Sequence, residues 1–229
     1  WAARRGLYTT VAGNRPSGTN ALLEDVVVPV DVLGTTCRDL TALFDAHGYQ
    51  DSVIFGHAKD GNIHFMLNEQ FRDAKQLVRY RDFTEEMVQL ILEADGSLKA
   101  EHGTGRIMAP FVRRQFGDEL FEVMREIKRL IDPKGFLNPG VVLAEEDTDY
   151  ATDLKVAETV EEEVDRCVEC GYCEPVCPSK DLTLTPRQRI VLRREIAAAD
   201  ANGDTKLSER LRQEYAYYGV DTCAVDGMC

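Results

Sequence analysis

Short runs of β-branched and aromatic apolar residues occur in three segments of the first 143 residues, and such runs predict β-strands. The three segments are residues 26–30, 52–55 and 62–67. Pro29 lacks the backbone donor that a sheet ladder needs, so the first segment predicts an edge strand or a strand end.

Three other segments repeat apolar residues at intervals of three and four, which predicts helices with one buried face. We expect the second helix to end near Gly96, and the third to span about residues 118–131 and stop at Asp132-Pro133. Together these elements predict a mixed α+β unit over residues 1–143. The apolar positions of the three predicted helices are Leu40, Leu43 and Phe44; Met87, Val88, Ile91 and Leu92; and Leu120, Val123, Met124, Ile127 and Leu130.

Acidic residues dominate the next segment, residues 145–165, in which Lys155 is the one basic residue. A charge run of this kind is typical of a solvated linker. We therefore divide the chain into a domain of residues 1–143, an acidic linker of residues 144–164 and a cysteine-bearing module of residues 165–229. Apolar residues at helical spacing in that module predict helices that separate two cysteine loops: Ile190, Val191 and Ile196, then Leu207, Leu211 and Tyr215.

The net formal charge of −13 argues against a nucleic-acid partner and offers no basic surface to anionic lipid. The chain has no run of eighteen apolar residues and no secretory signal pattern. Because its cysteines cluster at metal-binding spacing, we expect a reducing, cytoplasmic location, with peripheral association at the inner face of the membrane left open. A chain that starts at Trp1 has the character of a fragment, and we expect it to lack turnover by itself.

The most specific chemical signal is Cys167-x2-Cys170-x2-Cys173-x3-Cys177 followed by Pro178. This spacing is the signature of a bacterial 4Fe-4S site, in which the fourth cysteine ligates a different cluster from the first three. A structural zinc site is the alternative, but it usually separates two cysteine pairs by roughly a dozen residues or more. The motif therefore predicts iron–sulfur clusters and electron transfer.

A second cluster needs further ligands, and Cys223-x5-Cys229 begins a second motif with Asp226 at a middle position. We expect a dicluster module, with Cys223 and Cys229 as ligands of the second cluster. The alternative is that these two cysteines are ordinary buried thiols. Cys37, alone in a helical stretch, is most simply a small buried hydrophobe.

Two of the four histidines flank a predicted hairpin, in which Asp60-Gly61 would form a two-residue turn. That turn would place His57 opposite His64, with their Cβ atoms about 5 Å apart, close enough to bind one divalent metal together. The alternatives are a surface histidine pair without function and a different turn register. His47, by contrast, precedes Gly48 and is best explained as a helix-capping residue.

Glu101-His102, followed by Gly103 and Gly105, supplies a third candidate ligand and a candidate general base. Taken alone, this motif is better explained by a glycine-rich loop capped by a solvated Glu and His.

These motifs, with the segment from Asp132-Pro133 to Asn138-Pro139-Gly140, resemble the C-terminal half of FAD-linked 2-hydroxyacid dehydrogenases. That family includes D-lactate dehydrogenases of the cytochrome type, glycolate oxidase and D-2-hydroxyglutarate dehydrogenase. The resemblance covers residues 1–143 and implies an antiparallel sheet covered by helices, with a ferredoxin-like arrangement. The cysteine module resembles the small helical iron–sulfur extension of some members.

The resemblance also implies roles for individual residues. His57, His64 and Glu101 would hold a divalent ion, zinc or manganese, and His102 would be the base. Arg4 matches the arginine that binds the substrate carboxylate, for which a bidentate guanidinium is suited. Asn138 lies in a loop that usually touches the flavin.

The implied activity is oxidation of a D-2-hydroxy acid to the 2-oxo acid by FAD, with electrons passed through 4Fe-4S clusters to a quinone, cytochrome or other protein. Met66 stands where hydroxyglutarate-type members tend to have asparagine, and a downstream lysine that they use is hard to find, so we expect a smaller substrate such as D-lactate. Glycolate and D-2-hydroxyglutarate are the alternative substrates. An electron-transfer module without its own substrate site and a zinc-stapled protein are the rival functions.

Overall fold

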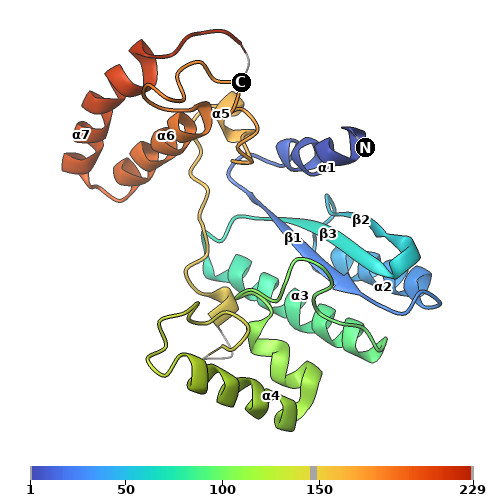
Figure 1. Cartoon of the computed structure of the whole chain (residues 1–229). Coiled ribbons are helices and arrows are strands. Elements are labelled where there is room, and N and C mark those ends of the chain that lie inside the picture. The colour runs from blue at the N-terminus through green and yellow to red at the C-terminus, as the bar shows by residue number, and fades with distance from the viewer. Residues whose placement is uncertain (1, 145–148, 228–229) are drawn as a thin grey trace. The chain divides into compact units, whose positions relative to one another are not determined.

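A computed structural model of the chain describes residues 2–144 and 149–227 (Figure 1), although the side chains of residues 2–5 and 149 are not described. The structure does not describe two of the predicted binding groups. Cys229 lies outside the described residues, and so does the side chain of Arg4.

The chain folds as two compact units. One, the sheet unit, is Leu22–Lys155, and the other, the cysteine unit, combines Trp1–Ala21 with Val156–Cys229. The first 21 residues therefore pack with the cysteine-bearing segment, whereas our division by sequence kept them with the first domain.

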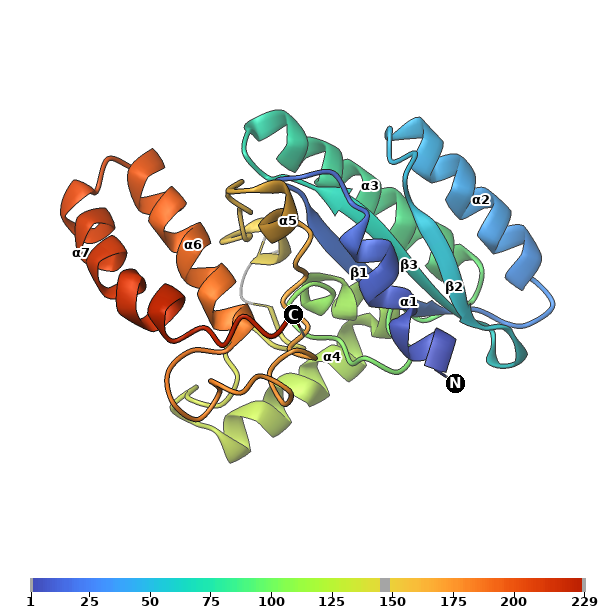
Figure 2. The same cartoon turned by 90° about the horizontal axis from the view of Figure 1, so that it is seen from above.

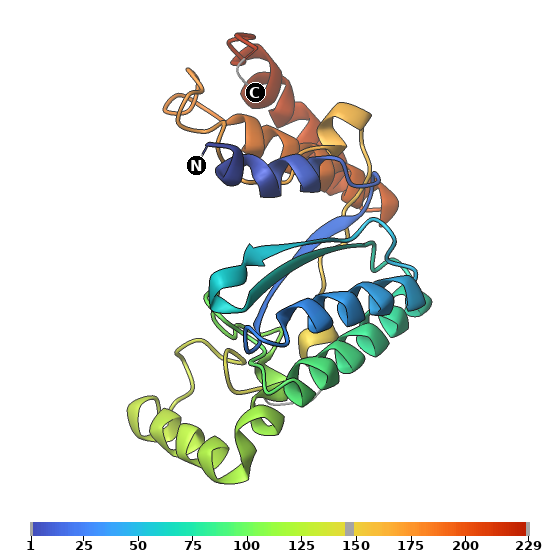
Figure 3. The same ribbon diagram turned by 90° about the vertical axis from the view of Figure 1, so that its right-hand side faces the viewer.

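The sheet unit is built on three strands in the order β1-β3-β2. Its helices α2 and α3 cover one face of the sheet (Figure 3). Because β1 lies at the edge and ends before Pro29, the predicted edge strand is confirmed. The principal elements of this unit are β1 (Asn20–Val27), α2 (Leu33–Ala46), β2 (Val53–His57), β3 (Asn62–Glu69), α3 (Ala74–Glu93) and α4 (Val112–Ile131).

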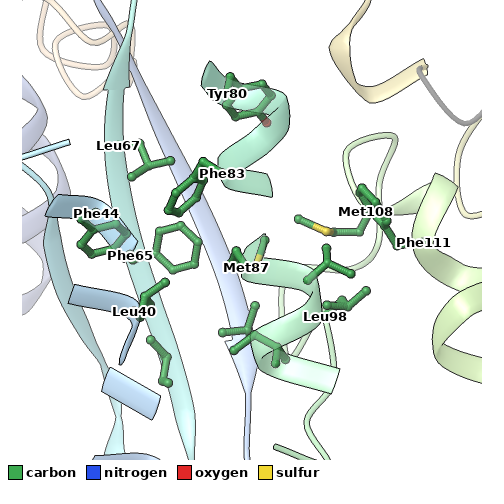
Figure 4. Packing of buried hydrophobic residues seen from close by; sticks show 14 of the residues in the cluster. Leu40, Phe44, Phe65, Leu67, Tyr80, Phe83, Met87, Leu98, Met108 and Phe111 are labelled. Atoms are coloured by element: carbon green, nitrogen blue, oxygen red, sulfur yellow. The ribbon is translucent and has the colours of Figure 1, made fainter. Parts of the chain in front are cut away.

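Alternate residues of the central strand build the core (Figure 4). Ile63, Phe65 and Leu67 are each at most 1% exposed and lie in one cluster with buried residues of α2 and α3. The ring of Phe44 on α2 lies 5.6 Å from that of Phe65 and 5.7 Å from that of Phe83 on α3. This packing leaves the other face of β3 to its remaining residues, which include His64.

The hairpin between β2 and β3 differs from the predicted one. His57 lies opposite Asn62 and Phe55 lies opposite His64, so the predicted pairing of His57 with His64 is wrong. The turn is longer than two residues, because a 3₁₀ turn, Ala58–Asp60, precedes Gly61 at φ 70°. The shift is two residues, so both histidines still lie on the same face of the sheet.

Helix α4 also departs from the prediction. It begins at Val112 and is kinked at Gly117, whose φ is 81°, so the predicted start near 118 corresponds to its second segment. The expected burial of its apolar face is wrong: Leu120 and Val123 are 53% exposed and Leu130 is 80% exposed. Helical spacing shows that a face is apolar, but it does not show what covers that face.

The cysteine unit consists of short helices around the cysteine loop. The apolar repeats predicted two helices here, and the structure has them as α6 and α7, which lie side by side (Figure 2). Arg15 fastens the N-terminal segment to the loop by donating to the carbonyl oxygens of Asp165 (3.0 Å) and Cys167 (3.1 Å). The helices of this unit are α1 (Ala2–Gly13), α5 (Glu162–Asp165), α6 (Pro186–Ala201), α7 (Thr205–Tyr215) and a π-helical turn, Ala216–Asp221.

The predicted architecture of a sheet-and-helix domain followed by a small helical module is confirmed. Among the described residues, no helix has both the length and the apolar character needed to span a bilayer.

Gly61 is expected to be essential for the hairpin that presents the two histidines. A Cβ at this position would lie 1.9 Å from the carbonyl oxygen of Val28, and its φ disfavours any L side chain. We predict that Gly61→Ala lowers the apparent Tm of the whole protein by roughly 5 °C more than Gly48→Ala does. Gly48 is the matched control, because its φ is +73° but a Cβ there meets nothing within 4 Å. Equal losses in the two variants would contradict this account.

Candidate metal centre and cysteine loop

Two neighbouring strands and one loop of the sheet unit bring His57, His64 and Glu101 together. His57 is the last residue of β2, His64 lies inside β3, and Glu101 lies in the loop that follows α3. One oxygen of Glu101 lies 3.1 Å from Nε2 of His57 and 2.9 Å from Nε2 of His64. One ligand atom from each of the three residues lies within 4.8 Å of the others, which is the spacing of donors around a single ion.

The imidazole rings of His57 and His102 both pack against the ring of His64. The ring of His102 is stacked on it at 4.8 Å and 9°, and the ring of His57 stands nearly perpendicular to it at 5.4 Å and 84°. The side chain of His64 is 7% exposed, whereas those of His102 and Glu101 are 43% and 51% exposed. The cluster therefore has one buried member and an open side from which a small molecule can reach His102.

Asp25, a fully buried residue of β1, organises this cluster. Its Oδ2 accepts hydrogen bonds from the backbone N–H groups of Ala100 (3.1 Å), Glu101 (2.7 Å) and His102 (2.8 Å). Its Oδ1 accepts one from Nδ2 of Asn62 at 2.7 Å. This carboxylate thus fixes the backbone of the loop that carries both the candidate ligand and the candidate base.

Asp25 also lies close to His64, with its Oδ1 3.3 Å from Nδ1 of the imidazole. The two atoms are near each other but are not aligned as a hydrogen bond, and Nδ1 is buried without another partner. An acidic residue behind a histidine is the usual arrangement that orients a metal-binding imidazole.

A second grouping, Asp25, His64 and His102, also brings one donor atom from each residue within 4.8 Å. We consider it the weaker metal site, because the oxygens of Asp25 already accept four hydrogen bonds. Within the described part of the chain, the polar neighbours recorded for Oε1 of Glu101 are histidine nitrogens, so Glu101 is better placed to give a lone pair to an ion.

The pKa values of the two buried groups suit these roles. Burial alone would raise the pKa of Asp25, but the N–H groups of His102 and Glu101 and the amide of Asn62 outweigh it, so the pKa falls below its usual value. Burial lowers the pKa of His64, and the neighbouring His102 and His57 lower it further against the opposing effect of Asp25 and Glu101. The result favours an ionised Asp25 and a neutral His64, the form of histidine that binds metals.

The cysteine loop belongs to the other unit. A small cavity there is lined by Cys173, Cys177, Cys223 and Asp226, so the structure brings the end of the first motif to the start of the second. The loop contains Gly171 at φ 80°, a conformation in which glycine is favoured. The thiols and one carboxylate at this place are the donor set of an iron–sulfur site, and they fit such a cluster.

The remaining predicted site residues lie elsewhere. Arg4 is in helix α1, within the cysteine unit. Asn138 lies in the loop after α4, with a φ of 45°, and its carbonyl oxygen accepts the N–H of Val141 at 3.2 Å. Asn138 is therefore not part of the histidine cluster, and its predicted contact with flavin stays a prediction.

Asp25 and Asn62 also shape this cluster, although the sequence motifs did not predict them. For Asp25 a signal existed, because Glu24-Asp25 interrupts an otherwise apolar strand and a charge buried in a strand calls for a partner. Asn62 gave no comparable signal.

Two family models match parts of this chain. Residues 1–142 match the family of FAD linked oxidases, C-terminal domain, and residues 163–229 match the 4Fe-4S dicluster domain. The chain therefore belongs to the FAD-linked oxidases and carries their C-terminal domain joined to a 4Fe-4S dicluster domain. The predicted family resemblance and iron–sulfur module are confirmed.

Individual relatives carry the names of 2-hydroxyacid-oxidising enzymes. Glycolate oxidase subunit GlcD of Bacillus subtilis is 29% identical over 63% of this chain and 30% of its own length. A probable mitochondrial D-lactate dehydrogenase of Danio rerio is 31% identical over 62% of this chain and 28% of its own. D-2-hydroxyglutarate dehydrogenase of Escherichia coli is 29% identical over 75% of this chain and 19% of its own. The chain thus spans between about a fifth and a third of these relatives.

Asp25→Asn should loosen the loop that Asp25 holds. Whichever way the amide is turned, its NH₂ group meets either the three backbone donors or the amide of Asn62, so charge-assisted hydrogen bonds worth about 1.5–3 kcal/mol each are lost. We predict that backbone amide exchange of residues 100–102, measured by hydrogen–deuterium exchange, becomes at least about tenfold faster.

Glu69→Gln is the control for general destabilisation, because Glu69 is a buried acid of β3 that pairs with Arg79 at 2.7 Å. It should leave exchange at residues 100–102 unchanged. Equal exchange rates in wild type and Asp25→Asn would show that Asp25 does not hold the loop.

Proposed function

We propose that the protein containing this chain oxidises a D-2-hydroxy acid, with D-lactate as the favoured substrate, to the corresponding 2-oxo acid. The observation that carries this proposal is the single Glu101 oxygen lying within 3.1 Å of Nε2 atoms from two histidines, next to a third histidine. The names of the relatives support the substrate class. The two histidines lie on β2 and β3, which are labelled in Figure 1.

His57, His64 and Glu101 would hold a divalent ion, either zinc or manganese. Two imidazoles and a carboxylate are a common ligand set of catalytic zinc sites, which keep a further position open. When bound, such an ion would act as a Lewis acid that lowers the pKa of the substrate hydroxyl. The open side at Glu101 and His102 leaves space for that hydroxyl.

His102 would take the hydroxyl proton as a general base. Its ring is fixed by stacking on His64 and by the hydrogen bond from its backbone N–H to Asp25, while its side chain stays 43% exposed. Its Nε2 lies 3.8 Å from the Glu101 oxygen, so a group bound beside Glu101 would lie near that nitrogen.

Arg4 would bind the carboxylate of the substrate and so anchor it. We favour D-lactate over D-2-hydroxyglutarate because Met66 stands where hydroxyglutarate-type members tend to have asparagine. Met66 follows His64 by two residues on the same face of β3 and is 1% exposed. A thioether at this place cannot bind a second carboxylate.

FAD would accept the C2 hydrogen with both electrons, and the 4Fe-4S clusters would pass these electrons singly to a quinone, a cytochrome or another protein. Asn138 would contact the flavin, and the cysteines of the dicluster domain would hold the clusters.

Metal analysis tests the ligand set. The whole protein, purified anaerobically, should contain about one zinc or manganese per chain in addition to its iron. We predict that His64→Asn loses this divalent metal and retains its iron, because the two sites share no ligand. His47→Asn is the control, since His47 lies outside the cluster and pairs with Glu86 at 3.3 Å. Iron as the sole metal in the wild type would instead favour an electron relay without a substrate site of its own.

Anaerobic reduction of the flavin by D-lactate tests the base. His102→Asn should keep its FAD and its divalent metal but reduce the flavin about 10²–10⁴ times more slowly than wild type, the usual contribution of a general base. L-lactate should leave the wild-type flavin oxidised, which controls for non-specific reduction. An unchanged rate in His102→Asn would remove this residue from the mechanism.

A further inference from the structure

Arg189 is a buried cation that faces a sulfur atom. It lies in the first turn of α6 and is 7% exposed. Its Nη1 lies 3.9 Å from Sγ of Cys177, and its Nη2 donates to the carbonyl oxygen of Thr222 at 3.4 Å. Its Nε is buried and has no hydrogen-bond partner among the residues that the structure describes. Other arginines of this unit are paired with acids, Arg187 with Glu174 and Arg194 with Glu169.

The same arginine joins the two cysteine segments. Thr222, which accepts its hydrogen bond, directly precedes Cys223, and Cys177 and Cys223 line one cavity with Arg189. Ser179 and Thr183 also bind Thr222, through its carbonyl oxygen at 2.5 Å and its hydroxyl at 2.7 Å. The guanidinium therefore lies where the end of the first motif meets the start of the second.

The charges around this cavity define what Arg189 does there. A buried guanidinium costs several kcal/mol unless an anion compensates it. Asp226 is one anion in the lining, and the thiolates that hold an iron–sulfur cluster would be others. Pro186, which also lines the cavity, is the first residue of α6, so the positive end of this helix dipole adds to the field of Arg189.

We propose that Arg189 positions Cys177 and raises the reduction potential of the cluster that Cys177 and Cys223 would share. Reduction adds one negative charge to the cluster, and a fixed cation in a poorly solvated place stabilises the more negative state. Arg189 thus favours the reduced form of this cluster. The inference rests on the dicluster domain and does not require the proposed substrate.

A redox titration of the whole protein, followed by electron paramagnetic resonance, tests this role. We expect Arg189→Met to lower the midpoint potential of one cluster by at least a tenfold change in its one-electron equilibrium, which is 59 mV, and to shift the other cluster far less. Arg189→Lys keeps the positive charge and should restore most of the potential. Arg212→Met is the control: it removes a charge from the same unit, but Arg212 pairs with Asp200 and lies outside the cavity lining.

Unchanged potentials in Arg189→Met, or equal shifts of both clusters, would overturn the proposal. If Arg189→Met purifies with depleted iron, the Arg189→Lys variant distinguishes a role of the positive charge from a structural role. Full iron and a near-wild-type potential in Arg189→Lys support a role of the charge, whereas iron loss there too shows a purely structural role. The titration uses dithionite and needs no hydroxy acid, so its result is independent of whether D-lactate is the substrate.

Discussion

The buried carboxylate of Asp25 is the constraint on which the candidate metal centre depends. It comes from β1, yet it holds the backbone of residues 100–102 and the amide of Asn62 at the start of β3, and it lies beside the ring of His64. Three segments far apart in the chain are thereby fixed relative to one another by one side chain. An ionised carboxylate in a fully buried position is stable only because its hydrogen bonds replace water. Other contacts, such as the ion pair of Lys99 with Glu24 and the buried Leu98, hold the start of this loop, but Asp25 holds the backbone of Glu101 and His102 themselves.

The sheet supplies the rest of the geometry. One face of β3 packs against α2 and α3 through Ile63, Phe65 and Leu67, so its alternate residues must lie on the opposite face. The long hairpin turn then sets His57 beside His64 on that face. Packing therefore fixes two of the metal-ligating candidates, and hydrogen bonding fixes the third. This division suits a site in which the histidines must be rigid and the loop must admit a substrate.

The parts that could be predicted from the sequence are those that local rules determine. The spacing of Cys167 to Cys177 identified an iron–sulfur module, because four thiols in one short loop have few other uses. The shared face of His57 and His64 was predicted although their register was wrong, since a slip of two residues preserves the face. A charge inside a strand signals that Asp25 needs a partner, but the partners themselves could not be predicted, because they include backbone groups about 75 residues away. The exposure of Leu120 and Leu130 was missed because periodicity does not reveal what lies outside a helix.

The central claim is that His57, His64 and Glu101 share one divalent cation. Anomalous diffraction from crystals of the whole protein, collected above and below the zinc and manganese absorption edges, tests it most directly. The account predicts one peak that disappears below the edge of its metal, about 2.1 Å from Nε2 of both histidines and next to the carboxylate of Glu101. A divalent ion bound elsewhere, or a map without a peak between these three side chains, would contradict it.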